Sequence, residues 1–231
     1  MNDVKYSLGS LHKDTATGIA FRIRQPAASA PRSCVVLLHG VGGSETNLAD
    51  LASGFDPDAI VVLPRGRIQL AAGQYAWFRV TFTASGPNIV ASEAEDSRLT
   101  LIRFVEQMQL AYGIEPRHTV IAGFSQGGIM SASVGLSTPE RVAGIGILAG
   151  RILPELEPRI AARERLATLS GFVAHGQFDD KLPVSWAQRS DDWLTEVGVP
   201  HVTRLYPVAH GLSPAMCADF LAWVHGLTGT R

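Results

Sequence analysis

The sequence contains little cysteine, no cluster of positive charge and no long apolar run. Its two cysteines, Cys34 and Cys217, are too few for a disulfide framework and lack the spacing of metal ligands. We therefore expect two buried thiols that act as small hydrophobic side chains, and no metal site. The 20 Lys and Arg residues nearly balance the 21 Asp and Glu residues without clustering. This balance argues against nucleic acid as the main partner.

Two further absences bear on where the protein is found. No stretch of about 18 apolar residues is present, so no membrane span is expected. The first residues include an acidic side chain and no apolar segment, which is unlike a secretory signal peptide. A cytoplasmic location is the expectation that remains.

The apolar content of the chain is that of a globular domain. Hydrophobic residues make up 46% of the 231 residues and charged residues 18%, so residues 1–231 are expected to form a single domain. Short β-branched runs alternate with longer segments of helical periodicity. The expected strands are 4–8, 20–24, 33–38, 59–63, 119–124, 142–148, 171–175 and 202–206. The expected helices are 92–111, 126–137, 184–197 and 214–225.

This alternation predicts an α/β fold with a mostly parallel central sheet, helices on both faces and an antiparallel edge formed by the first strands. Ser92 and Glu95 have the spacing of a capping box at the start of the long helix, and Gly113 is expected to end it. Long connections over 65–91 and 149–168, the second with a short charged helix, are expected near the carboxyl edge of the sheet. Both are too short to form a large cap domain.

A short glycine-containing motif supplies a candidate nucleophile. Gly123-Phe124-Ser125-Gln126-Gly127 follows an expected buried strand and begins a helix of small residues. The G-x-S-x-G pattern between a strand and a helix is typical of a nucleophile elbow, whose glycines avoid clashes with the adjoining elements. Such a turn exposes the serine hydroxyl above the sheet. The alternative is a serine that only caps the helix.

A second glycine-rich segment follows the expected strand 33–38. Residues 39–43 read His-Gly-Val-Gly-Gly, and such a backbone can turn its amides toward the elbow. The backbone N–H groups of Val41 and Gln126 are the expected donors of an oxyanion hole. A phosphate-binding loop is the alternative, but the segment lacks both G-x-G-x-x-G and a Walker lysine. His39 is expected to make structural hydrogen bonds at the strand end.

A serine hydroxyl needs a base to take its proton. His210 lies between the last expected strand and the last helix, which suits the order Ser, acid, His of this elbow type. His225 also follows the acid candidates, but it is expected to be solvated at the end of the terminal helix. Asp179 and Asp180 both follow the strand 171–175, and either carboxylate could orient the imidazole. Position alone does not separate them.

These segments resemble the phospholipase/carboxylesterase family of α/β-hydrolases, which includes bacterial carboxylesterases and acyl-protein thioesterases. The resemblance covers nearly the whole chain and rests on residues 38–43, Ala76-Trp77-Phe78, residues 123–128, His175-Gly176 followed by Asp179 and Pro183, and Ala209-His210-Gly211.

The resemblance implies an α/β-hydrolase fold and several residue roles. It places the acid on Asp179, the third residue after the glycine of His175-Gly176, and the oxyanion donors again on Val41 and Gln126. It implies that Trp77, with Phe78 beside it, forms part of an acyl groove. The chain departs from the family in having Lys181-Leu182 where a β-branched pair is common. A homodimer is compatible with the resemblance, although no surface stripe indicates one.

The resulting expectation is a cofactor-independent serine carboxylesterase that hydrolyses short- to medium-chain carboxylic esters, a small-molecule substrate class, through an acyl-enzyme. A thioesterase acting on acyl-proteins or small thioesters would use the same residues. A non-catalytic ligand receptor could keep the same fold and pocket. A dienelactone-hydrolase-like enzyme would instead have cysteine at the elbow, where this chain has Ser125.

Overall fold

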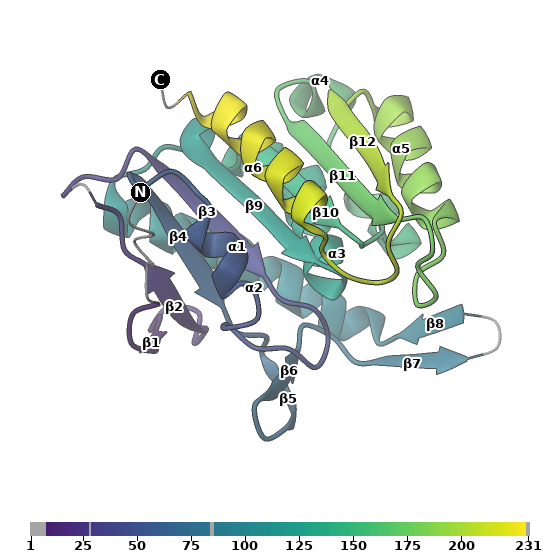
Figure 1. Cartoon of the computed structure of the whole chain (residues 1–231), viewed down its shortest axis with the longest axis horizontal. Coiled ribbons are helices and arrows are strands. Elements are labelled where there is room, and N and C mark those ends of the chain that lie inside the picture. Colours follow the sequence, from purple (N-terminus) through teal and green to yellow (C-terminus); the bar gives the residue numbers. More distant parts are fainter. Residues whose placement is uncertain (1–7, 28, 84–85, 230–231) are drawn as a thin grey trace.

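The computed structural model describes residues 8–27, 29–83 and 86–229. Within these residues one central sheet of eight strands carries helices on both faces (Figure 1). The strand order is β1-β2-β4-β3-β9-β10-β11-β12. The strands are β1 (His12–Lys13), β2 (Ala20–Arg24), β3 (Ser33–Leu38), β4 (Ala59–Pro64), β9 (Thr119–Phe124), β10 (Gly144–Leu148), β11 (Ser170–Gly176) and β12 (His201–Tyr206). The helices that cover the sheet are α1 (Ala49–Ser53), α2 (Ala91–Tyr112), α3 (Gln126–Ser137), α5 (Ser185–Val197) and α6 (Pro214–Thr228).

Strand direction confirms the predicted topology. In the sheet order β4-β3-β9-β10-β11-β12, each strand pairs in parallel with its neighbour. At the edge of the sheet, β2 pairs antiparallel with both β1 and β4. Every predicted strand from 20–24 onward is present close to its predicted bounds. The predicted strand 4–8 falls mostly outside the described residues, and the edge strand that is described begins at His12.

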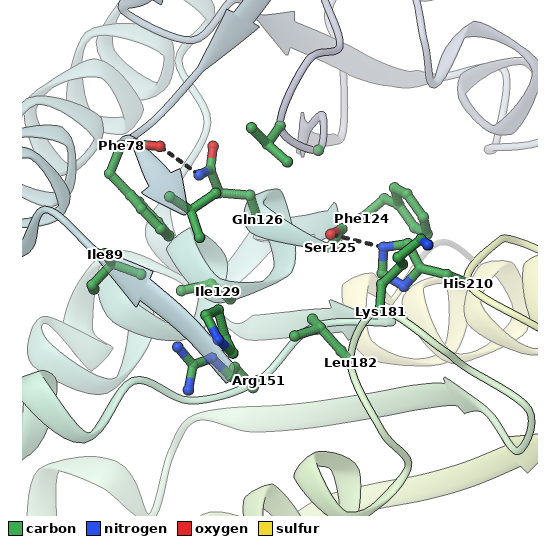
Figure 2. A pocket seen from close by; sticks show the side chains of 14 residues that line it. Phe78, Ile89, Phe124, Ser125, Gln126, Ile129, Arg151, Lys181, Leu182 and His210 are labelled. Atoms are coloured by element: carbon green, nitrogen blue, oxygen red, sulfur yellow. Dashed lines mark hydrogen bonds between the residues drawn. The ribbon is translucent and has the colours of Figure 1, made fainter. Parts of the chain in front are cut away.

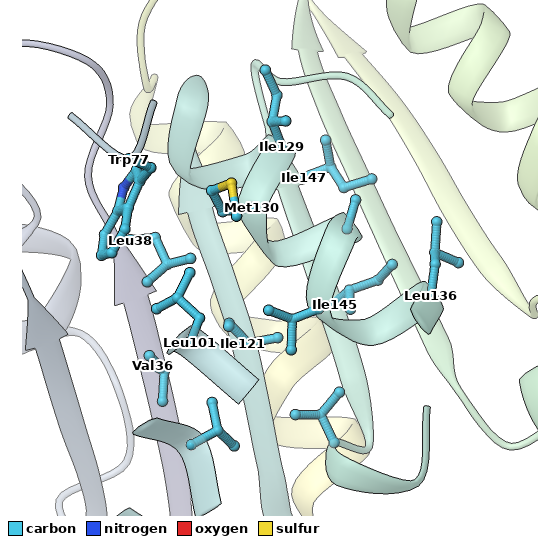
Figure 3. Packing of buried hydrophobic residues seen from close by; sticks show 14 of the residues in the cluster. Val36, Leu38, Trp77, Leu101, Ile121, Ile129, Met130, Leu136, Ile145 and Ile147 are labelled. Carbon is cyan, nitrogen blue, oxygen red and sulfur yellow. The ribbon is translucent and has the colours of Figure 1, made fainter. Parts of the chain in front are cut away.

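Side-chain alternation along the buried strands divides the core between the two faces of the sheet. In β3, Val36 and Leu38 pack in the cluster that also holds residues of α2, α3 and α5 (Figure 3). Val35 and Leu37 pack with residues of α1 and α6 on the other face. Because helices cover both faces, each buried strand needs apolar residues at every position, which is why these strands read as continuous apolar runs.

The predicted helices are present, but the expected start of the long helix is wrong. Gly113 ends α2 in a left-handed conformation with φ 64°, as predicted. The capping box of Ser92 and Glu95 is not formed, because α2 begins earlier with Val90 as its N-cap. The Glu95 carboxylate instead pairs with Arg98 at 2.7 Å. No helix within the described residues is both long and apolar enough to span a bilayer.

The two long connections contain more regular structure than the sequence indicated. Residues 65–91 form two β-hairpins instead of a loop, the first turning at Gly73 with φ 72°. Residues 149–168 include the predicted short charged helix, and neither connection builds a cap in its described part (Figure 1). The added elements are β5 (Ile68–Ala71), β6 (Gln74–Ala76), β7 (Val80–Thr83), β8 (Gly86–Ile89), η3 (Pro154–Arg159) and α4 (Arg163–Leu166).

The two thiols differ in burial. Cys34 is fully buried in β3, as predicted, and burial raises the pKa of its thiol to about 12. Cys217 lies on α6 and is only half-buried, so the prediction of two buried thiols is correct for Cys34 alone.

A buried ion pair braces the segment that follows β3. The Glu45 carboxylate accepts two hydrogen bonds from Arg65, at 2.7 and 2.8 Å, and one from Arg22 at 3.3 Å. The Arg65 hydrogen bonds hold the pKa of the Glu45 carboxyl well below its usual range, at about 2. Because Arg65 follows β4 and Arg22 lies in β2, the pair ties the glycine-rich segment to the edge of the sheet.

We expect the Glu45→Gln variant to lose about 1–3 kcal/mol of unfolding free energy at neutral pH, since it leaves two guanidinium groups without their carboxylate. Because the pKa of Glu45 is lower in the folded state, its carboxylate stabilises the fold fully at pH values above the pKa of an unfolded glutamate, about 4.3. That contribution disappears as the pH falls toward 2. Urea titrations at several pH values should therefore show a wild-type advantage that shrinks on acidification.

The matched control is Glu115→Gln, which removes a carboxylate from an exposed pair with Arg117. Exposed pairs contribute only about 0–1 kcal/mol, so this variant should stay close to wild type. If wild type exceeds Glu45→Gln in unfolding free energy by the same amount at acid and at neutral pH, the ion pair is not the cause of the difference.

Candidate active site

Three predicted site residues meet at the carboxyl edge of the sheet. Ser125 follows β9, Asp179 follows β11 and His210 follows β12. The Nε2 atom of His210 lies 3.0 Å from the Ser125 Oγ (Figure 2), and the His210 Nδ1 lies 2.6 Å from the Asp179 Oδ2. Parallel strands bring their carboxyl ends to one edge, so residues distant in sequence become neighbours here.

The turn at Ser125 depends on a close approach of backbones. Ser125 has φ 55° and ψ −116°, a conformation that residues with a side chain rarely adopt. Its amide donates to the Leu148 carbonyl of β10 at 2.8 Å. A Cβ at Gly127 would collide with the Leu38 carbonyl at the end of β3, and one at Gly123 would collide with Gly127. The glycines of the motif therefore permit the elbow that the pattern predicted.

The structure separates the two adjacent aspartates. The Asp179 side chain is fully buried, and its Oδ1 accepts hydrogen bonds from the amides of Leu182 at 2.8 Å and Lys181 at 2.9 Å. Its Oδ2 is thereby directed to His210. The Asp180 side chain is 68% exposed and pairs with the Lys181 ammonium at 3.2 Å. Only Asp179 contacts the imidazole.

A buried histidine to which the sequence analysis gave no role of its own contacts the same carboxylate. His175, at the end of β11, is fully buried, and its Nε2 lies 2.7 Å from the Leu182 carbonyl. The same nitrogen lies 3.2 Å from the Asp179 Oδ2. Since a carbonyl only accepts, the Nε2 carries the hydrogen that it shares between these oxygens. His175 thus fixes the turn that holds Asp179.

His39 has the structural role that the sequence predicted. The Gly66 amide donates to its Nε2 at 2.8 Å, which leaves Nδ1 as the protonated nitrogen that donates to the Gly40 carbonyl at 2.7 Å. Burial lowers the pKa of this imidazole and keeps it neutral. His201 begins β12 at the opposite end of the strand, and His225 lies exposed on α6, so neither joins the site.

Val41 and Gln126 line the same pocket as Ser125, and their backbone amides have no acceptor in the part of the chain that the structure describes. In the glycine-rich segment, the Gly42 amide donates to the Tyr75 carbonyl and the Gly43 amide to the Gly40 carbonyl. No acceptor among the described residues takes the amide hydrogens of Val41 and Gln126. The sequence predicts an oxyanion hole from these same two amides, and the absence of an acceptor there is compatible with that prediction.

The Gln126 side chain has a separate role that the motif did not indicate. Its Oε1 accepts from the Trp77 amide at 2.8 Å, and its Nε2 donates to the Phe78 carbonyl at 2.7 Å (Figure 2). The elbow is therefore hydrogen-bonded to the segment that leads into the second hairpin. An amide side chain is the group that can both donate and accept in this way.

A pocket of about 230 Å³ opens beside Ser125. Most of its lining is apolar and comes from the second hairpin, the helix after the elbow and the turn after Asp179: Phe78, Val80, Pro87, Ile89, Ile129 and Leu182. Arg151 also lines it (Figure 2).

The prediction that Trp77 lines this pocket is wrong, whereas Phe78 does line it. Trp77 is 0% exposed, and its indole N–H donates to the His39 carbonyl at 3.0 Å. Its ring also packs against the His39 ring, with centroids 5.4 Å apart. The indole therefore packs against the start of the glycine-rich segment and does not line the pocket.

The sheet order, the strained serine turn and the convergence at the carboxyl edge define an α/β-hydrolase. The sequence pattern of the phospholipase/carboxylesterase family matches residues 20–226. The chain belongs to this family and is a serine hydrolase of the esterase and thioesterase type.

Two individual relatives share about a quarter of their aligned residues with this chain. Acyl-protein thioesterase 1 of Emericella nidulans is 26% identical over 77% of this chain and 82% of its own length. Acyl-protein thioesterase 1 of Eremothecium gossypii is also 26% identical, over 87% of this chain and 91% of its own.

Solved structures show the same fold. A carboxylesterase from Mesorhizobium loti superposes with a TM-score of 0.80 at 22% identity, over 94% of this chain and 100% of its own. Esterase PE8 superposes with a TM-score of 0.78, also at 22% identity, over 95% of this chain and 100% of its own. At these identities the similarity establishes architecture alone.

The arrangement around Asp179 generates a test. We expect Asp179→Asn to lower kcat for a reactive ester by about 10⁴-fold. The asparagine oxygen can still accept the amides of Lys181 and Leu182, so its NH₂ group would face His210 and favour the wrong tautomer. Initial rates at saturating ester measure the effect.

Asp180→Asn is the matched control, because it removes the neighbouring carboxylate from an exposed position. It should change kcat by no more than about twofold. A large loss in Asp180→Asn with activity retained in Asp179→Asn would reverse the assignment of the acid.

Proposed function

We propose that this protein hydrolyses short- to medium-chain carboxylic esters, with Ser125 as nucleophile, His210 as base and Asp179 as the orienting acid. The observation that carries the proposal is the continuous hydrogen-bonded series from Ser125 Oγ through His210 to Asp179. A hydroxyl within 3.0 Å of an imidazole nitrogen can lose its proton as it attacks a carbonyl carbon.

The reaction proceeds by two acyl transfers. Ser125 Oγ bonds to the carbonyl carbon while its proton passes to His210 Nε2, and the imidazolium is stabilised by Asp179. The bond from carbon to the alcohol oxygen then breaks, and the departing oxygen takes the proton from His210. Water next attacks the acyl-enzyme and gives its proton to His210, which returns it to Ser125 as the acid leaves.

Both transfers place negative charge on the carbonyl oxygen. The amides of Val41 and Gln126, which have no acceptor among the described residues, are positioned to receive it. Each donor of this kind typically accelerates the reaction by about 10²–10³-fold. Because Trp77 and His39 brace the segment that carries Val41, that donor is held in place before substrate binds.

Two hollows flank His210, and their linings suggest which part of the ester each one takes. The apolar pocket contains Ser125, to which the acyl group becomes bonded. The second hollow lies along Gly40–Gly43, Phe124 and Gly211–Leu212 and includes His210 but not Ser125. Since His210 must reach the departing oxygen, we assign the second hollow to the alcohol and the apolar pocket to the acyl chain.

Pocket size supports a limit on acyl length. The acyl pocket of about 230 Å³ is smaller than the roughly 300–1,000 Å³ of sites for drug-sized ligands. Its walls include the second hairpin, Ile129 and Leu182, and no cap covers them in the part of the chain that the structure describes. This geometry suits short and medium acyl chains, and aryl alcohols in the open hollow.

The names of the relatives favour a thioesterase as the second candidate. Several proteins matched over most of this chain are acyl-protein thioesterases, at 24–27% identity. A thioester presents the same carbonyl carbon and only the departing atom differs, so the same residues would serve. Matched phenyl butyrate and phenyl thiobutyrate separate the two activities by their kcat/KM ratio.

Hydrolysis of a p-nitrophenyl ester series from acetate to long acyl chains tests the proposal. We expect kcat/KM to be highest for short or medium chains. Ser125→Ala should lower kcat by at least about 10⁴-fold, because it removes the nucleophile. Ser53→Ala, an exposed hydroxyl on α1, is the control and should act like wild type.

Turnover that survives Ser125→Ala would overturn the mechanism, and a sharp preference for long chains would overturn the size argument. Binding of an ester without any turnover by the wild type would favour a ligand receptor built on the same fold.

A further inference from the structure

The acyl pocket contains one charged side chain whose burial is unusual. Arg151 is 5% exposed and lines the pocket together with Ser125 and the apolar side chains around it. Figure 2 shows its guanidinium on the side of the pocket away from His210, toward Ile89. Lys181 also lines the pocket, but its side chain is 60% exposed and pairs with the Asp180 carboxylate. A buried cation in a mostly apolar pocket requires a physical reason, because burial opposes charge.

No carboxylate among the described residues pairs with this guanidinium. Its Nε is buried without a hydrogen-bond acceptor. The exposed Glu155 influences it only at longer range, and burial lowers the pKa of the guanidinium. The Trp186 ring lies 4.3 Å from its central carbon, a cation–π contact that orients the group without supplying a counter-charge.

Two other buried arginines, Arg98 and Arg24, each donate hydrogen bonds to acceptors within the protein. Arg98 is bonded twice to the Glu95 carboxylate, at 2.7 and 2.8 Å. Arg24 donates to the carbonyls of Asp56 and Ala59. Arg151 has neither kind of partner, so its hydrogen-bonding capacity is directed at the pocket.

The backbone holds Arg151 close to the reacting serine. Arg151 follows β10, and β10 is the neighbour of β9, the strand that Ser125 follows. The intervening Ala149 has φ 50°, and a Cβ at Gly150 would lie 2.9 Å from the Ser125 carbonyl oxygen. The backbone segment that carries Arg151 therefore packs directly on the elbow, and the Trp186 ring contacts the guanidinium.

We propose that Arg151 binds a carboxylate at the far end of the acyl chain, so that the preferred substrates are half-esters of dicarboxylic acids. The proposal rests on the hydrolase function above and specifies its substrate class. Apolar side chains between Ser125 and Arg151 would contact the methylene chain, and the planar guanidinium would bind the carboxylate by two parallel hydrogen bonds. Water cleaves the ester bond and releases an alcohol and a dicarboxylate.

Alkyl half-esters and neutral esters of equal carbon number provide the test. Monoethyl adipate is compared with ethyl hexanoate by proton release at constant pH, and shorter and longer pairs define the reach of the site. Wild type should favour the charged member of the best pair. Arg151→Met, which keeps an apolar stem, should lower kcat/KM for that half-ester at least about 30-fold and leave the neutral ester within about threefold.

Arg189→Met is the matched control. Arg189 also contacts the Trp186 ring, at 4.9 Å, but it does not line the pocket. It should retain the wild-type preference. Arg151→Met should have a thermal midpoint equal to or above that of wild type, because it removes a buried charge that lacks a partner.

Equal losses for charged and neutral esters in Arg151→Met would assign Arg151 a structural role and overturn the proposal. So would a wild-type preference for the neutral member of every pair. If no ester is turned over, the hydrolase function has failed, and calorimetric titration with adipate still decides the Arg151 site. Adipate binding that is lost in Arg151→Met supports the site, and binding that is absent in wild type or unchanged in the variant contradicts it.

Discussion

The backbone of the turn at Ser125 lies against the end of β3 with no room for a side chain between them. A Cβ at Gly127 would collide with the Leu38 carbonyl, and Ser125 itself is held at φ 55° by its neighbours. The close approach sets the distance between two segments that must act together, the elbow and the glycine-rich segment after β3. Both donors of the proposed oxyanion hole, Val41 and Gln126, take their positions from it.

Hydrogen bonds from buried polar groups extend this rigidity outward. The Trp77 indole N–H donates to the His39 carbonyl, and the indole does not line the pocket. The Gln126 side chain bonds to the Trp77 amide and to the Phe78 carbonyl. His175 fixes the turn of Asp179 in a similar way. The Trp77 indole N–H and the Gln126 side-chain amide are satisfied within the protein, as burial requires. The Arg151 Nε, by contrast, is buried without an acceptor. The partner that we propose for this guanidinium is the carboxylate of a bound substrate.

Much of the fold followed from local pattern, and the exceptions have physical causes. Strands such as β3 and β9 are buried on both faces, so their sequences are apolar throughout and easily recognised. The local pattern did not predict the hairpins within 65–91, because their strands are short and only partly buried. The capping box of Ser92 and Glu95 did not form because α2 begins earlier, with Val90 as its N-cap, and the Glu95 carboxylate pairs with Arg98 one turn along the helix. A spacing motif does not reveal such a competing partner.

The sequence by itself determined the order of elements, the elbow around Ser125 and the candidates His210 and Asp179, because glycine spacing and apolar runs act over a few residues. Position along the chain left Asp179 and Asp180 open, the family resemblance favoured Asp179, and the tertiary structure shows that Asp179 contacts His210. Tertiary structure alone decided that the Trp77 indole is buried outside the pocket and that Arg151 lines it. These outcomes depend on the direction of side chains at the ends of different strands. That direction is set by packing between segments far apart in the chain, which no local pattern encodes.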